Sequence, residues 1–154
     1  MIAIRHTGIY VNDIITLEKF YTKVFNMTAI CSMLPDKNNI FDELLGIKNV
    51  KIVTTKLITP CGKEKGQGDM LELVKVLSSS NFQNLPKNYS IATQGIAHVA
   101  FSVDDINYTV EMIKNMGGIQ ITSIATMENG NNLCFCRDPE HNWIELIQKN
   151  SKTN

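Results

Sequence analysis

The chain has 154 residues, 44% of them hydrophobic, and its 15 basic and 15 acidic residues give a formal net charge of zero. These totals predict one compact domain or two small, closely packed ones and argue against a disordered chain. With balanced charge and no apolar run as long as a membrane span, we expect no nucleic-acid or membrane partner.

The first half of the chain shows alternating strand and helix signals. Strands are predicted at residues 3–11, 28–33, 50–59 and 70–77. Leu17, Phe20, Tyr21 and Val24 form an apolar stripe at helical spacing, with Asp13 before it as a turn or N-cap residue, which predicts a helix over 16–25. Between the strands we expect a polar turn at 35–39, a short helical turn at 41–45 and an exposed hairpin at 61–69, a segment that contains glycines and charged residues.

The second half repeats this order after a segment rich in serine and asparagine that lacks periodicity. Strands are predicted at 97–103, 119–125, 132–137 and 143–148, and a helix at 106–116. The Asp-Pro sequence at 138–142 predicts a tight turn that holds His141 at the surface. We therefore expect a first module at 1–77, a linker at 78–94, a second module at 95–149 and a tail at 150–154.

The two halves are related by an internal repeat. His6 and His98 each open a strand, and the residues that follow them match at a constant offset of 92 positions. Glu72 and Glu145 lie in Leu-Glu-Leu and Ile-Glu-Leu, 73 positions apart. The first half is 19 residues longer between its His and its Glu, and we place the extra residues between 35 and 68. The repeat predicts the same architecture for both halves.

Strand alternation indicates where these side chains point. His6 shares a face with Gly8 and Tyr10, and His98 shares a face with Ala100 and Ser102, so small neighbours leave room for a cavity. The two glutamates are flanked by large apolar residues, where a carboxylate is costly unless it is paired or binds metal.

The residues together predict a site for one divalent metal ion. Two imidazoles and two carboxylates are a sufficient ligand set: His6, Glu72, His98 and Glu145. A lone strand histidine is more often structural, but two of the chain's three histidines fall at equivalent positions. Common ancestry of the halves, without metal, is the alternative.

The four cysteines are unevenly spaced, as in reduced cytosolic proteins, and the N-terminus enters a strand without a signal-peptide pattern. We therefore expect a cytoplasmic protein. Cys134 and Cys136 lie two apart on one predicted strand. A soft-metal or redox pair is one interpretation, but two packed thiols are favoured.

The chain resembles the vicinal oxygen chelate superfamily of glyoxalases, bleomycin resistance proteins and extradiol dioxygenases. The motifs that carry the resemblance are HTGIYVND at 6–13, LEL at 71–73, GIAHVAF at 95–101 and RDPEHNWIEL at 137–146. His141 departs from the glycine that the family usually has in this turn. The resemblance implies an α+β fold in which two βαβββ modules form a curled mixed sheet around a cleft. It also implies that the first and last strands of each module supply the metal ligands.

Within this superfamily, a set of four ligands resembles glyoxalase I and methylmalonyl-CoA epimerase. That implies a metal-dependent lyase or isomerase, in which Glu72 and Glu145 are ligands and also move a proton next to a carbonyl of a small substrate. The metal would be Ni, Co, Zn, Fe or Mn. A homodimer is expected, and the site could form within one chain or across the dimer. A drug-binding protein of the bleomycin-resistance type and an extradiol dioxygenase are the alternatives.

Overall fold

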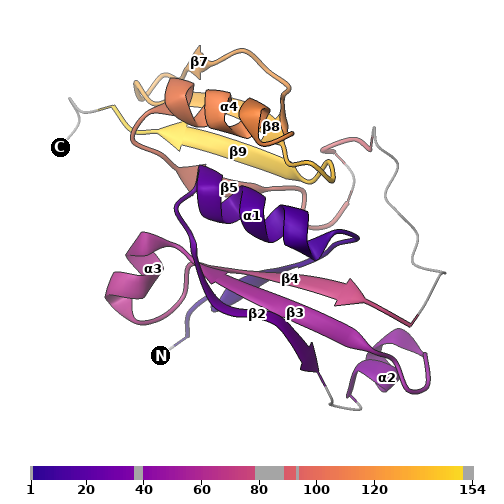
Figure 1. Ribbon diagram of the computed structural model, residues 1–154. Helices are drawn as coiled ribbons and strands as arrows, with labels where there is room; N and C mark the ends of the chain where they lie inside the picture. The colour runs from indigo at the N-terminus through magenta and orange to yellow at the C-terminus, as the bar shows by residue number, and fades with distance from the viewer. Residues whose placement is uncertain (1, 37–39, 79–88, 93, 151–154) are drawn as a thin grey trace. The chain divides into compact units, whose positions relative to one another are not determined.

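The computed structural model describes residues 2–36, 40–78, 89–92 and 94–150. The chain forms two compact units, Met1–Asn84 and Leu85–Asn154, each an α+β module of the vicinal oxygen chelate fold (Figure 1). Residues 79–88 and 93 of the predicted linker, and 151–154 of the predicted tail, lie outside the described residues. Among the described residues, no helix combines the length and the apolar character needed to cross a membrane.

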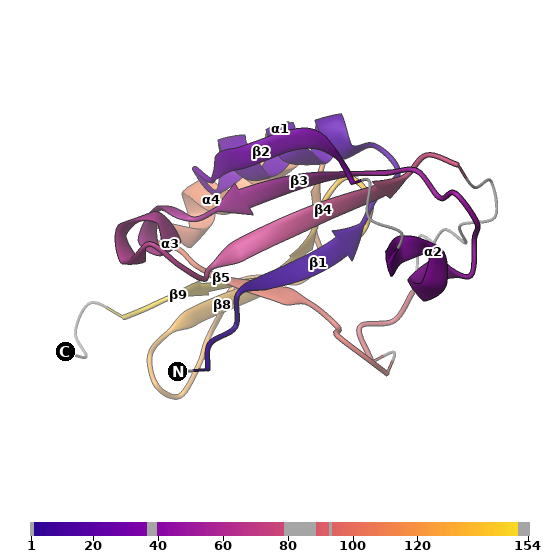
Figure 2. The same cartoon turned by 90° about the horizontal axis from the view of Figure 1, so that it is seen from below.

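The first unit is a four-stranded sheet with three helices. Its elements are β1 (His6–Tyr10), α1 (Ile14–Val24), β2 (Thr28–Asp36), α2 (Ile40–Leu45), β3 (Ile52–Ile58), α3 (Pro60–Lys65) and β4 (Met70–Val76). The strand order is β1-β4-β3-β2, and Figure 2 shows β1, β4 and β3 side by side. β1 and β4 are parallel, whereas the other neighbours are antiparallel. The first strand is therefore an edge strand beside the last one.

Helix α1 covers one face of this sheet, and its apolar stripe explains why. Asp13 caps the helix by accepting a hydrogen bond from the Thr16 amide at 3.1 Å. Leu17 and Phe20 are fully buried, and Leu73 is fully buried in the sheet. Along β1 the exposure alternates, with the odd-numbered residues half-buried and the even-numbered ones exposed. The predicted faces are confirmed, and the face that carries His6 is the one opposite the helix.

The second unit repeats this plan with shorter connections. Its elements are β5 (Val99–Ser102), α4 (Ile106–Asn115), β6 (Ile119–Gln120), β7 (Ala125–Thr126), β8 (Asn132–Arg137) and β9 (Trp143–Gln148). The strand order is β5-β9-β8-β6, with β7 also paired to β8. β5 and β9 are parallel, as β1 and β4 are in the first unit. Ile106, Val110 and Ile113 form the buried stripe of α4.

Three sequence predictions were wrong in detail. The segment 61–69 is not a hairpin, because Thr59 caps helix α3, Pro60 occupies its first turn and Gly66 ends it in the left-handed conformation at φ 71°. Strand β2 continues to Asp36, so residues 35 and 36 of the predicted turn belong to the strand, and residues 37–39 lie outside the described residues. The strand predicted at 119–125 is two strands of two residues, β6 and β7, which pair with different parts of β8. The 19 extra residues of the first half are accommodated around α2 and α3.

Cys134 and Cys136 are fully buried neighbours on β8. The hydrogen bond between the thiols and burial both raise the pKa of Cys136, which therefore stays a neutral thiol. The favoured prediction of two packed thiols is confirmed.

The turn between β8 and β9 is held by a buried carboxylate. Asp138 has no exposed surface and accepts hydrogen bonds from the amides of Glu140 and Asn142, both at 2.9 Å, and from the Asn142 side chain at 2.8 Å. His141 adopts the left-handed conformation, φ 69°, and is half-buried in the turn. The turn fixes where β9 begins, two residues before Glu145.

We expect Asp138→Ala to destabilise the protein by about 3 kcal/mol, because a buried acceptor of charge-assisted bonds is lost and its donors are left unpaired. Urea unfolding followed by circular dichroism measures this. The exposed Asp104→Ala is the matched control and should change stability by less than about 0.5 kcal/mol. Equal stabilities of the two variants would contradict the role given to Asp138.

Candidate functional site

In the first unit, the register of β1 against β4 brings His6 and Glu72 together. Gly8 is the direct partner of Glu72, and His6 precedes it by two residues on the same face. The imidazole Nε2 lies 3.2 Å from Oε2 of the carboxylate. The His6 side chain is 36% exposed and that of Glu72 is 18% exposed. Both side chains thus lie on the sheet face opposite helix α1 and are partly exposed, within reach of a ligand.

In the second unit, His98 and Glu145 are paired in the same way. Ala100 is the direct partner of Glu145, and His98 precedes it by two residues, just before β5. Nε2 of His98 lies 3.0 Å from Oε2 of Glu145, and the exposed fractions are 35% and 16%. The repeat found in the sequence is therefore also a repeat of register, distance and exposure.

The chemistry of each pair fits a divalent metal ion. An octahedral ion with bonds of about 2.1 Å places adjacent ligand atoms about 3.0 Å apart, close to both separations observed. Imidazole nitrogen and carboxylate oxygen are ligands that Ni, Co, Zn, Fe and Mn accept. Within the described residues, no cluster of three or more potential metal-binding side chains occurs. Each unit thus unites two of the four predicted ligands.

Space for a ligand lies beside both glutamates. A Cβ added at Gly8 would meet no atom within 4 Å. Ala100, at the equivalent position beside Glu145, is exposed. Small residues therefore leave open space next to both carboxylates.

The third strand of each sheet makes the two pairs chemically different. Lys56 on β3 is the direct partner of Glu72, and its Nζ lies 3.1 Å from Oε1. Phe135 on β8 is the equivalent partner of Glu145, and its ring contacts His98 edge-on at 5.7 Å between centroids. Sequence reasoning missed Lys56. The signal was a single charged residue in the otherwise uncharged strand IVTTKLI.

Aromatic residues extend the apolar side of the second pair. Phe135 meets Trp143 at 6.4 Å between ring centroids. The Arg137 guanidinium lies 4.1 Å from the centroid of the Trp143 ring and donates a hydrogen bond to the carbonyl oxygen of Tyr89 at 2.8 Å. Burial raises the pKa of the Tyr89 phenol, which stays neutral. These contacts fix the orientation of Trp143, two residues from Glu145.

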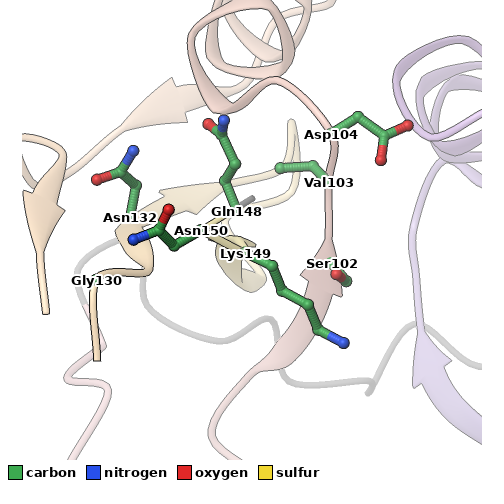
Figure 3. Close-up of a pocket in the computed structure, with 8 residues that line it drawn as sticks. All are labelled: Ser102, Val103, Asp104, Gly130, Asn132, Gln148, Lys149 and Asn150. Carbon is green, nitrogen blue, oxygen red and sulfur yellow. The ribbon is translucent and has the colours of Figure 1, made fainter. Parts of the chain in front are cut away.

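An open pocket of about 520 Å³ lies at the end of β5 in the second unit. The amide side chains of Asn132, Gln148 and Asn150 gather along it, with Ser102 on its other side (Figure 3). Gln148 already accepts a hydrogen bond from the amide of Ile106 at 3.0 Å. None of the four predicted ligands lines this pocket.

A family model and a curated relative point to the same protein family. The family model of the Glyoxalase/Bleomycin resistance protein/Dioxygenase superfamily matches residues 3–146. A "Probable lactoylglutathione lyase" of Vibrio cholerae is 28% identical over 146 residues, which cover 94% of this chain and 89% of that protein.

Solved structures agree on the fold. A glyoxalase family protein from Bacillus cereus superposes with a TM-score of 0.77 at 18% identity, covering 96% of this chain and 94% of the other. A genomically encoded fosfomycin resistance protein from Listeria monocytogenes gives a TM-score of 0.61 at 14% identity, covering 99% and 97%. The fold is thus shared by proteins with different names.

Proposed function

Because the chain belongs to the Glyoxalase/Bleomycin resistance protein/Dioxygenase superfamily, we propose that it is a metal-dependent lyase or isomerase of the glyoxalase type. It would move a proton next to a carbonyl of a small substrate that chelates the metal. The observation that carries the proposal is the presence of two His–Glu pairs in the same register, each with its nitrogen and oxygen 3.0–3.2 Å apart.

The ligands in this proposal are His6, Glu72, His98 and Glu145, which would hold one divalent ion. The ion, when bound, supplies a Lewis acid that stabilises the negative charge developing on a substrate oxygen. Two carboxylates balance the two charges of the ion, and the two neutral imidazoles complete the set.

The glutamates also carry the proton in the proposed reaction. A carboxylate beside the substrate takes a proton from the carbon next to the carbonyl and returns it to the neighbouring carbon. Phe135 and Trp143 border Glu145 with apolar surface. Apolar neighbours limit the access of water to the carboxylate.

The relatives guide the choice of substrates to assay. The similarity to a protein named as a lactoylglutathione lyase makes hemithioacetals of α-keto aldehydes the first compounds to assay. Thioesters of 2-methylmalonate, the substrates of the epimerase type, come second. Hemithioacetals carry two oxygens on neighbouring carbons. Both classes of compound have a carbonyl next to an acidic carbon, which the proposed proton transfer requires.

Metal analysis and light scattering of one preparation test this proposal. Protein purified without added metal is expected to contain about one transition-metal ion per chain, because four ligands bind such ions tightly. The same sample should be a homodimer at tens of micromolar, since β1 and β5 are edge strands of their sheets and open edges favour pairing.

The alternatives are separated by the same preparation. A chain that contains no metal and does not rebind Ni, Co, Zn, Fe or Mn would be a binding protein rather than this enzyme. Metal-loaded protein that turns over neither substrate class, but consumes oxygen with catechols, would be an extradiol dioxygenase. A monomer at this concentration would contradict the dimer alone.

A further inference from the structure

Lys56 places a positive charge beside the His6–Glu72 pair. Its ammonium lies 3.1 Å from Oε1 of Glu72, on the other oxygen from the one that faces His6. The Lys56 side chain is 40% exposed, so the ammonium remains accessible from the open face of the sheet. An ammonium has three N–H donors, and the contact with Glu72 uses one.

The repeat shows that this lysine is not required to build the fold. The equivalent residue, directly across from Glu145, is Phe135. Among the ion pairs of the described residues, Glu145 has His98 as its partner and no lysine or arginine. The same register thus exists without a cation, and Lys56 is a feature that this half has in addition.

This step rests on the proposed function: when the metal is bound, the net charge of the site depends on Lys56. A divalent ion and two glutamates sum to zero, so Lys56 leaves the assembled site with one net positive charge. The carboxylate of Glu72 would then share its charge between the ion, on the oxygen that faces His6, and the ammonium, on the other oxygen. An ammonium that is partly removed from water and shares its counter-charge in this way attracts a further anion with the N–H donors that Glu72 does not use.

We propose that Lys56 binds an anionic oxygen group of the substrate, such as a carboxylate, next to the pair of oxygens that chelate the metal. Lys56 would then be a specificity-determining residue that selects anionic over neutral substrates of the same size.

Two hydroxamic acids with the same chelating head test this assignment. Succinic acid monohydroxamate has a carboxylate at its end, and butyrohydroxamic acid has a methyl group there. Calorimetric titration of the Co²⁺-loaded protein should show about tenfold tighter binding of the carboxylate compound, the scale of one charge-assisted hydrogen bond. Lys56→Gln should abolish this preference, and Lys56→Arg should keep most of it.

The matched control is Lys75→Gln on β4. This change removes the same charge from the neighbouring strand, but Lys75 is an odd-numbered residue of β4 and lies on the opposite sheet face from Glu72. The Lys75→Gln variant should therefore keep the preference for the carboxylate compound.

The outcomes distinguish two failures. If Lys56→Gln binds Co²⁺ and butyrohydroxamic acid normally and keeps the preference, or if the wild-type protein shows none, the role of Lys56 is wrong and the metal site stands. If the wild-type protein binds neither Co²⁺ nor butyrohydroxamic acid, the proposed function fails, and the role of Lys56 fails with it.

Discussion

Replacing Glu145 or Glu72 by Gln is expected to lower turnover by roughly two to four orders of magnitude, the usual contribution of a general acid–base group. Gln keeps the size of the side chain and one acceptor oxygen but lacks the basic carboxylate. Steady-state assays at saturating metal measure the effect. Metal binding should weaken less than it does when a histidine ligand is removed.

The two glutamate variants should also differ from each other. Glu72 contacts both His6 and Lys56, whereas the ion pair recorded for Glu145 within the described residues is with His98. Glu72→Gln therefore disturbs Lys56 as well, and its KM for an anionic substrate should change more than that of Glu145→Gln.

The control is Glu128→Gln, an exposed glutamate in the turn after β7, which should leave turnover unchanged. If the glutamates only hold the metal, activity in both site variants would follow metal occupancy and recover fully at saturating metal. Such recovery would refute their role as proton carriers.

Removal of either predicted histidine ligand is expected to weaken metal binding by at least about 100-fold, because His6→Ala and His98→Ala each remove a direct bond to the ion. Competition with a chelator of known affinity measures this. Since the two pairs share register and distance, the two variants should lose similar affinity.

The third histidine is the natural control for this experiment. His141 lies in the turn before β9 with φ 69°, a conformation that Asn also tolerates, so His141→Asn should fold and bind metal normally. Full stoichiometry and unchanged affinity in both ligand variants would show that the histidines are structural.

Some features of this protein could be predicted from the sequence because they depend on local periodicity. Alternation along β1 and β5 assigned His6 and His98 to the faces opposite the apolar residues, and the helical stripe of 16–25 predicted α1. The strand over 143–148 has the predicted bounds. Local rules were less reliable where signals competed: glycines at 62, 66 and 68 suggested a hairpin, but Thr59 and Pro60 started helix α3.

Only the tertiary structure decided which residues lie beside the glutamates. Cross-strand register joins residues far apart in the chain: Gly8 with Glu72, and Lys56 with the same carboxylate from the strand on its other side. A slip of one residue would have moved Lys56 to the helix face. The sequence therefore determined the repeat and its four candidate ligands, whereas strand pairing determined that each His contacts its Glu and that one pair faces a lysine and the other a phenylalanine.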